Sequence, residues 1–334
     1  MSSKEKPMHA GTHVKRIAAL AALSALAACG GGGAGTNADG TSSFTVAVIE
    51  PDLTTVPILA AVDAVRQAGH QVKVVELAEP ELAIEGLAKG DYAISAEATS
   101  PALIAIEQDA PIKIIADVIG NQWAIYSKPG ISSCDDLSGR PFGIFSEGAV
   151  ATAMAKEWVG AQCGAGKRPN YLTIGGSDVR AQALVAGQID ATPLEISDVA
   201  ILESSGKEKF TQVVDFAKTL PDLHPQTVYA NTGFLTEHKA AAQAFVTALV
   251  REHAKINADP QHLVSLAAKY LPDEDAAHTA EIAQRYVKAK LFDAPALTEQ
   301  NVQGTIDFFV RAGVIKQGMT ARDAADLSFV KAAA

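Results

Sequence analysis

The chain has 334 residues, and its 38 Asp and Glu residues outnumber its 28 Lys and Arg residues, giving a formal net charge of −10. Hydrophobic residues make up 48% of the chain and charged residues 20%, which is typical of a soluble globular protein and excludes a disordered chain. No basic stripe follows residue 16, so the sequence argues against a nucleic-acid-binding protein. The length favours two domains.

The first 28 residues have the three-part form of an export signal. Lys15 and Arg16 precede an apolar stretch that ends in small residues and is too short to span a bilayer core of about 30 Å. The run Leu26-Ala27-Ala28-Cys29 resembles a bacterial lipobox, which predicts cleavage before Cys29 and a lipid on its sulfur. An ordinary signal peptide with a chance cysteine is the alternative. Residues 29–43 are rich in Gly and Ser and are expected to form a flexible tether.

These features predict an exported protein that contacts a membrane only through the lipid anchor at Cys29. It would lie in the periplasm, or on the outer face of the membrane in a bacterium with a single membrane. Two further cysteines, Cys134 and Cys163, are most simply a disulfide pair in an exported protein, with two free buried thiols as the alternative. Neither lies near a His or a second Cys at metal-ligand spacing, so we expect no metal site.

From residue 44 onward, short β-rich runs alternate with helical stretches. We predict strands over 44–50, 71–77, 92–96 and 112–119, and helices over 56–68 and 81–89 that end at Gly69 and Gly90. Another helix is expected to begin at Ser100, as N-cap, followed by Pro101 in its first turn. This alternation predicts a mainly parallel sheet with both faces covered by helices.

The same alternation recurs in the second half of the chain. We predict strands over 141–145, 171–174, 190–194, 210–216 and 227–231, and helices over 149–162 and 177–186. After residue 236 the chain is almost wholly helical. The segment that joins a helix through Gly90 to a strand ending in Glu97 matches a segment in which Gly187 precedes Glu195. The sequence therefore predicts two similar α/β lobes.

These patterns resemble the solute-binding proteins of ABC importers, in the NMT1/THI5-like family that handles nitrate, sulfonates, taurine and thiamine-precursor pyrimidines. The resemblance rests on four runs, which are Thr45–Glu50, Gly86–Ile94, Pro129–Ile144 and Ser177–Ala191. It implies an α/β fold of the two-lobe periplasmic-binding-protein clamshell type (type II), with two crossing strands and a helical C-terminal segment. We expect the crossings near 123–127 and 227–231, with lobe 1 over 44–124 and 230–334 and lobe 2 over 125–229.

The resemblance also implies a function without catalysis. A monomer would capture a small polar nutrient in the cleft between its lobes and deliver it to an ABC permease and its ATPase, with no cofactor. A ligand-sensing lipoprotein is an alternative with the same fold and another partner. An enzyme similar to the pyrimidine synthases is the least favoured alternative, because the sequence has no Gly-x-Ser-x-Gly, His-Glu-x-x-His or Walker lysine motif.

Candidate ligand-binding residues lie at the ends of the predicted strands, because open α/β sheets bind ligands outside the carboxyl ends of their strands. They are Glu50, Asp52, Thr54, Thr55, Glu97, Thr99, Ser100, Trp123, Ser146, Glu147, Thr152 and Glu195. Trp123 would stack on a planar ligand or, alternatively, pack in the core. Ser146 and Thr152 have helix capping as their alternative role. His224, which lies before the return crossing, is expected to be a solvated turn residue rather than a cleft residue.

Four of these candidates are glutamates, at positions 50, 97, 147 and 195, whereas Arg180 is the one base nearby. Carboxylates around one cleft would repel an anion by roughly 1–4 kcal/mol per close charge pair. This favours a ligand with amino, amidine or ring N–H donors, such as an aminopyrimidine. The alternative is a sulfonate, taurine or nitrate ligand, with the glutamates only complementing helix dipoles at about 0.3–1 kcal/mol each.

Overall fold

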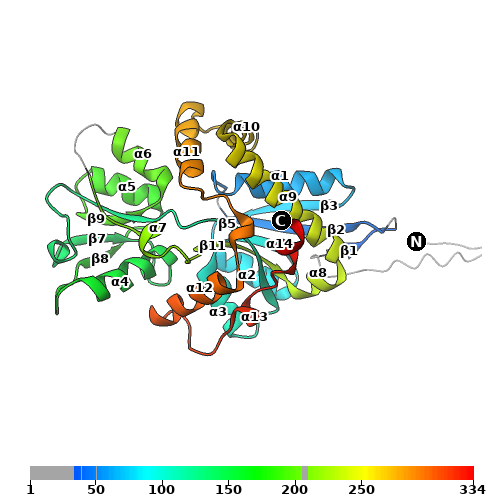
Figure 1. Ribbon diagram of the computed structural model, residues 1–334, viewed down its shortest axis with the longest axis horizontal. Helices are drawn as coiled ribbons and strands as arrows, with labels where there is room; N and C mark the ends of the chain where they lie inside the picture. Colours follow the sequence, from blue (N-terminus) through cyan, green and yellow to red (C-terminus); the bar gives the residue numbers. More distant parts are fainter. Residues whose placement is uncertain (1–33, 39, 50, 205–209) are drawn as a thin grey trace, which may run out of the picture. The chain divides into compact units, whose positions relative to one another are not determined.

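Two β-sheets with flanking helices form the α/β part of the chain, as the ribbon of the computed structural model shows (Figure 1). The structure describes residues 34–38, 40–49, 51–204 and 210–334. The predicted signal peptide, the predicted lipidation site Cys29 and the candidate ligand residue Glu50 therefore lie outside the described residues. No helix in the described part of the chain is long and apolar enough to cross a membrane.

The first sheet has the strand order β1-β2-β4-β11-β5, and β3 also pairs with β2. Strand β2 is parallel to β3 and β4, whereas β11 lies antiparallel between β4 and β5. The strands are β1 (Ala34–Thr36), β2 (Ser42–Ile49), β3 (Gln71–Leu77), β4 (Ile94–Ala98), β5 (Ile112–Ile119) and β11 (Gln226–Asn231). The predicted strands over 71–77 and 112–119 are confirmed at both ends.

The first two helices of this sheet begin and end within one residue of the predicted bounds, and the third begins one residue before the predicted Ser100. They are α1 (Val56–Gln67), α2 (Pro80–Lys89) and α3 (Thr99–Glu107). Gly90 ends α2 with φ +80°, a left-handed conformation that costs glycine little because it has no Cβ. The buried face of α1, which includes Val62 and Val65, packs against α9 (Lys239–Ala258).

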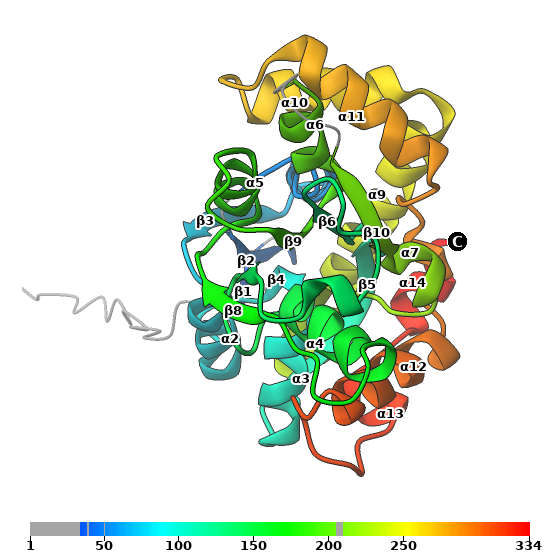
Figure 2. The same ribbon diagram turned by 90° about the vertical axis from the view of Figure 1, so that its left-hand side faces the viewer.

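The second sheet has the strand order β10-β6-β9-β7-β8. Its strands are β6 (Ala124–Ser127), β7 (Pro141–Ile144), β8 (Asn170–Thr173), β9 (Ala191–Leu194) and β10 (Thr211–Asp215). Helices α4 (Val150–Gln162) and α5 (Ser177–Val185) pack against β9, and Figure 2 shows both beside the strands of this sheet. A further helix, α6 (Ile196–Ser204), was not predicted, and a short helix, α7 (Phe216–Thr219), follows β10.

The chain passes from the first sheet to the second over residues 120–123 and returns over residues 216–225. The return therefore precedes the predicted crossing at 227–231. Residues 226–229, which we expected in lobe 2, lie instead in β11 of the first sheet. The reason is the burial of β11 between two strands, where Val228 and Tyr229 are fully enclosed. A run of β-prone residues indicates a strand but does not indicate its sheet.

The C-terminal part is helical, as the sequence predicts. After α8 (Thr232–Glu237) and α9, the helices are α10 (Pro260–Tyr270), α11 (Ala276–Lys288), α12 (Glu299–Arg311), α13 (Ala321–Ala324) and α14 (Ser328–Ala333). Several begin at a side-chain cap: Asp259 accepts from the Gln261 N–H and Asp275 from the His278 N–H. Helix α11 contacts α6, and Arg285 of α11 forms an ion pair with Glu203.

Part of the predicted tether is folded. Residues 34–36 form β1, which pairs antiparallel with residues 42–44 of β2. The backbone N–H of Asn37 also donates to the carbonyl of Thr41, at 2.7 Å, and closes the turn between the two strands. The expectation of a flexible segment as far as residue 43 is therefore wrong, because these residues find backbone partners along the edge of β2.

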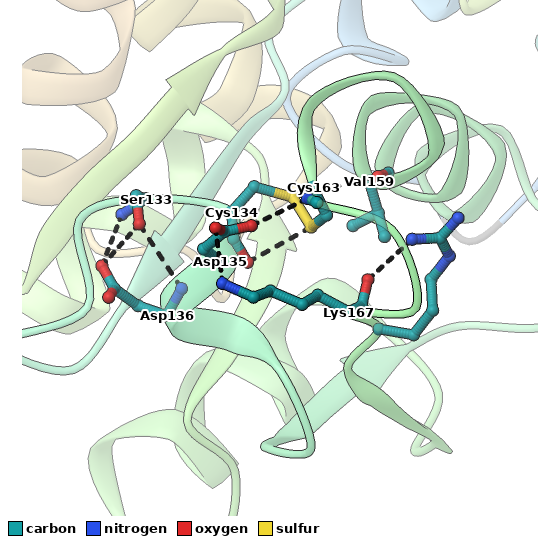
Figure 3. Close-up of a disulfide and its surroundings, with 9 residues drawn as sticks. Ser133, Cys134, Asp135, Asp136, Val159, Cys163 and Lys167 are labelled. Atoms are coloured by element: carbon teal, nitrogen blue, oxygen red, sulfur yellow. Dashed lines mark hydrogen bonds and ion pairs between the residues drawn. A yellow bond between two sulfur atoms is a disulfide. The ribbon is translucent and has the colours of Figure 1, made fainter.

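Cys134 and Cys163 form a disulfide, so the favoured pairing is confirmed (Figure 3). Their Cα atoms are 5.0 Å apart, and the two residues are 29 positions apart in the sequence. Closing a loop of this length stabilises the fold by about 3–4 kcal/mol on the chain-entropy model. The bond joins the segment before β7 to the end of α4. Next to it, Asp135 accepts from the Gly164 N–H at 2.8 Å and from Lys167 Nζ at 2.7 Å.

Candidate functional site

Three acidic side chains from the two sheets interact with one another, and we call Asp52, Glu97 and Glu195 the acidic cluster. Asp52 follows β2, Glu97 lies near the end of β4, and Glu195 comes directly after β9. Burial raises the pKa of Glu195 and of Glu97; the charges of Asp52 and Glu97 raise that of Glu195 further, and the charge of Asp52 raises that of Glu97 further. The structure therefore brings together acids from corresponding strand ends in the two halves of the sequence.

Burial is the largest cause of the shifted pKa of Glu97, which rises from 4.5 to about 7. The charges of Asp52 and Glu81 add to the rise, whereas the N–H of Ala98 and the side chain of Gln226 oppose it by bonding to the carboxylate. About half of the Glu97 side chains are therefore protonated at neutral pH, which reduces the repulsion within the acidic cluster.

The carboxyl of Glu195 is also enclosed. Burial raises its pKa well above the usual value, and the neighbouring charge of Asp198 adds to this effect. Asp198 in turn accepts from the Glu195 backbone N–H at 3.3 Å, and burial raises the pKa of Asp198 to about 6. The two acids stand at the beginning of α6, where the positive end of the helix dipole offsets part of their repulsion.

The loop at Asp52 organises the beginning of α1. Its Oδ1 accepts from the backbone N–H and the hydroxyl of Thr54, at 2.8 and 2.7 Å, and from the same two groups of Thr55, both at 3.1 Å. Thr54 and Thr55 are buried, and each hydroxyl proton is used on Asp52. These two residues are therefore placed beside the acidic cluster as acceptors and as supports for Asp52.

Thr99 and Ser100 lie in the first turn of α3. Thr99 is fully buried, and its hydroxyl donates to the His224 carbonyl at 2.8 Å and lies 3.1 Å from Thr227 Oγ1. Ser100 does not cap the helix, because α3 begins one residue earlier, at Thr99. Its hydroxyl instead lies 3.5 Å from the carbonyl of Gly148, which belongs to the loop after β7. The predicted cap at Ser100 is therefore corrected.

Trp123 and Arg180 pack together. Trp123 is 7% exposed, and the Arg180 guanidinium lies 6.0 Å from the centre of its ring. Arg180 donates to Thr192 Oγ1 and to the Pro193 carbonyl, both at 3.1 Å, and to the Gly175 carbonyl. Burial lowers the pKa of Arg180 to about 10, so the side chain remains a cation at neutral pH. This base therefore holds backbone of the second sheet in place and balances part of the nearby negative charge.

The candidates around the start of α4 differ from the acidic cluster. Glu147 is exposed and forms an ion pair with Lys156. The helix begins at Val150 after the cap residue Ala149, with no side-chain cap bond, so neither Ser146 nor Thr152 caps it. Thr152 is fully buried within α4, and its hydroxyl has no partner among the residues that the structure describes.

The sequence patterns did not indicate two buried glutamines. The candidates were chosen as polar residues at the carboxyl ends of predicted strands, and these two uncharged residues lie outside such ends. Gln122 donates from Nε2 to Glu195 Oε2 at 2.9 Å, and Gln226 bonds to Glu97 through its side chain. Tyr286 of α11 was also missed: it is fully buried, and burial raises its pKa, with a further rise from the charges of Asp52 and Glu195. In the sequence, Tyr286 is one of the apolar residues that recur along a C-terminal helix, and this pattern indicates only that its side chain is buried.

His224 is buried, not solvated as we predicted. Its Nδ1 lies 2.9 Å from Asp117 Oδ1 of β5. Burial opposes the charged imidazole, but the adjacent Asp117 carboxylate outweighs it and raises the pKa of His224. The turn that contains His224 is fixed further by Thr305, whose hydroxyl accepts from the His224 backbone N–H at 3.0 Å. His224 therefore fixes the return connection to β5 through its pair with Asp117, which is remote in sequence.

Oxygen atoms that can accept hydrogen bonds are the most numerous polar groups of this candidate site. The acidic cluster supplies carboxyl oxygens, and Gln122 and Gln226 add amide oxygens. In the described part of the chain, no group of three or more His, Cys, Asp or Glu residues is arranged to hold a metal ion. A separate groove of about 610 Å³ is lined by residues of α12 and α13, and it contains none of the candidate ligand residues.

Comparison with known proteins gives a family and a fold. No curated protein matches the sequence, but a family model described as NMT1/THI5 like matches residues 66–263. The ligand-binding component of an ABC-type import system from Staphylococcus aureus, solved with zinc bound, is similar at a TM-score of 0.70. It has 14% identity, and the match covers 87% of this chain and 98% of that chain.

Two other solved structures are similar over most of their length. The alkanesulfonate-binding protein SsuA from Xanthomonas axonopodis pv. citri, bound to MOPS, has 15% identity and a TM-score of 0.65, with 84% of this chain and 96% of that chain covered. A Candida albicans protein described as having the generic periplasmic binding protein structural fold has 13% identity and a TM-score of 0.63, with 85% and 96% covered. The α/β periplasmic-binding-protein fold is therefore confirmed.

Proposed function

Because this chain belongs to the NMT1/THI5-like family, we propose that it is the solute-binding component of an ABC importer. It captures a small polar nutrient and delivers it to a permease and its ATPase. The names of similar structures from Staphylococcus aureus and Xanthomonas axonopodis, an import component and an alkanesulfonate-binding protein, support this role. The observation that carries the proposal here is the acidic cluster, whose members come from both sheets.

We propose that the ligand occupies the position between Glu97 and Glu195 and touches the strand ends of both sheets. Contacts to both sheets favour a state in which they are held together, so ligand binding shifts the population toward a closed form. The permease then recognises that form. The two connections, over 120–123 and 216–225, are the segments about which such a closure turns.

The ligand is nitrogenous rather than a simple anion. Two of the acids have raised pKa values because they are enclosed and repel one another, and an anion would add to that repulsion. Amino, amidine or ring N–H groups would instead donate to the carboxyl oxygens and favour their ionised form. An aminopyrimidine-like compound has this chemistry. A sulfonate is the second candidate, favoured by the similarity to a protein named for alkanesulfonates.

We also propose that the mature protein is a monomer that begins at a lipidated Cys29 and lies outside the cytoplasm. The Cys134–Cys163 disulfide supports an exported location, because disulfides persist in oxidising compartments. Mass spectrometry of the membrane fraction checks the anchor: a diacylglyceryl group on Cys29 is expected, and an unmodified Cys29 would contradict it.

The experiment that tests the ligand class combines native mass spectrometry of gently purified protein with thermal unfolding. We expect a nitrogen-rich compound to be retained, and we expect aminopyrimidines or amidines to raise the unfolding temperature. Glu195→Gln should reduce this stabilisation, whereas Glu147→Gln, a matched change at an exposed acid, should leave it unchanged. Stabilisation by taurine, an alkanesulfonate or nitrate, with none from pyrimidines or amines, would show that the ligand class is wrong.

A further inference from the structure

Two buried glutamines lie where the chain passes between the sheets. Gln122 belongs to the first connection, over 120–123, and is 4% exposed. Gln226 is the first residue of β11, directly after the second connection, and is 7% exposed. In the register of the first sheet, Gln226 pairs with Ala98 of β4 and with Ile119 of β5, so it stands at the ends of both strands.

Each glutamine bonds to one glutamate of the acidic cluster. Nε2 of Gln122 donates to Glu195 Oε2 at 2.9 Å, across from the first connection to the end of β9. The Gln226 side chain bonds to Glu97 at the end of β4 and lowers its pKa against the effect of burial. The two halves of the site therefore repeat one arrangement, in which an amide on a connection or directly after it orients a carboxyl at a strand end.

The carbonyl oxygen of each glutamine side chain has no hydrogen-bond partner among the described residues. Oε1 of Gln122 and Oε1 of Gln226 are both enclosed, and neither accepts a hydrogen bond from any residue that the structure describes. Leaving a buried acceptor unpaired is unfavourable, so such a group in a folded protein calls for a partner. The adjacent Asp52, Glu97 and Glu195 do not satisfy these oxygens either, because none of their side chains makes a hydrogen bond with either Oε1.

We propose that Gln122 and Gln226 determine specificity by accepting N–H groups from two ends of the bound nutrient. This inference rests on the proposed function and narrows its ligand to compounds with at least two N–H donor groups, such as a diaminopyrimidine. At one end the ligand donates to Glu97 and Gln226, and at the other to Glu195 and Gln122. An isosteric compound with methyl groups in place of amino groups leaves the four acceptors unpaired and is rejected.

The test compares 2,4-diaminopyrimidine with 2,4-dimethylpyrimidine by isothermal titration calorimetry on the full-length mature protein. We expect the wild type to bind the diamino compound at least a hundredfold more tightly. Gln122→Met and Gln226→Met should each weaken binding of the diamino compound about tenfold and bring the two affinities closer. Gln212→Met, a matched change at an exposed glutamine of β10, should alter neither affinity.

Other outcomes overturn the inference. Unchanged affinity for the diamino compound in both methionine variants, or equal weakening for both compounds, would give the glutamines only a structural role. Should either variant fail to fold by circular dichroism, Gln122→Asn and Gln226→Asn replace it, with the same expected loss. If the wild type binds another nitrogenous nutrient but not 2,4-diaminopyrimidine, this inference fails and the proposed import function stands. If it binds only sulfonates, both the ligand class and this inference fail.

Discussion

Replacing Glu97 with glutamine removes one titrating group from the acidic cluster and leaves its shape nearly unchanged. In the folded protein the pKa of Glu97 is about 7, against 4.5 for a free glutamate, because burial and the charge of Asp52 disfavour the carboxylate. The folded state therefore binds this proton more tightly than the unfolded state. The stability that this protonated carboxyl contributes to the folded state is fully present below about pH 4.5 and is lost as the pH rises through 7.

The magnitude follows from the same two values. Each pKa unit is worth about 1.4 kcal/mol, so the rise from 4.5 to about 7 corresponds to roughly 3 kcal/mol. The wild type should lose up to about 3 kcal/mol of unfolding free energy between pH 4.5 and pH 8 through Glu97 alone. Glu97→Gln, whose amide stays neutral, lacks this loss and should be the more stable protein at pH 8.

Urea unfolding of both proteins at pH 5, 6, 7 and 8 measures the effect. The difference between the two curves reports the titration of Glu97 together with its effect on Glu195, whose pKa is raised by burial and also by the Glu97 charge, while Asp52 and Glu81 are present in both proteins. Glu147→Gln serves as the control, since this acid is exposed and the variant should run parallel to the wild type. Parallel curves for Glu97→Gln would refute the reasoning, because they would mean that Glu97 titrates alike in the folded and unfolded chains.

Three further predictions concern stability. Replacing Cys134 and Cys163 together with alanine should lower the free energy of unfolding by about 3–4 kcal/mol in urea, and a reductant should have the same effect on the wild type; equal midpoints would contradict the loop-closure account. Arg180→Met should cost roughly 3–5 kcal/mol by thermal unfolding, since it strands buried acceptors and acids; a loss below about 0.5 kcal/mol would show that the guanidinium is dispensable. His224→Leu should also cost about 3–5 kcal/mol at neutral pH, because Asp117 is left buried and alone. Adding Asp117→Asn should recover part of that loss, and no recovery would mean that the two do not act as a pair.

Sequence patterns predicted the elements well where one rule dominated. Apolar runs bounded by turn residues located β3 and β5 at both ends, whereas β4 lies two residues later than predicted. Helix α6 was missed because it follows β9 after one residue, without a glycine or proline to mark the change. The sheet to which β11 belongs depends on its pairing with β4 and β5, and such long-range contacts cannot be inferred from a local sequence pattern.

The candidate site was predictable only in its charged part. The rule that ligands bind at carboxyl ends of strands selected Asp52, Glu97 and Glu195, and the structure brings them together. Gln122 and Gln226 were missed because Gln122 lies on one connection and Gln226 directly after the other, and the position of both follows from the passage between the sheets. His224 was misplaced for a related reason: its proline-flanked turn suggests solvent, and its partner Asp117 is too far away in sequence for a local pattern to reveal.

With the proposed lipid on Cys29, strand β1 would set how far the folded body reaches from a membrane. A fully extended chain spans at most about 3.6 Å per residue, so fifteen residues from Cys29 to the predicted first strand at 44 would allow roughly 54 Å. Ala34 is already paired with Phe44 of β2, which leaves five residues and a reach of about 18 Å. A lipid on Cys29 would therefore keep this edge of the first sheet within about 18 Å of the lipid headgroups, close to any permease embedded beside it.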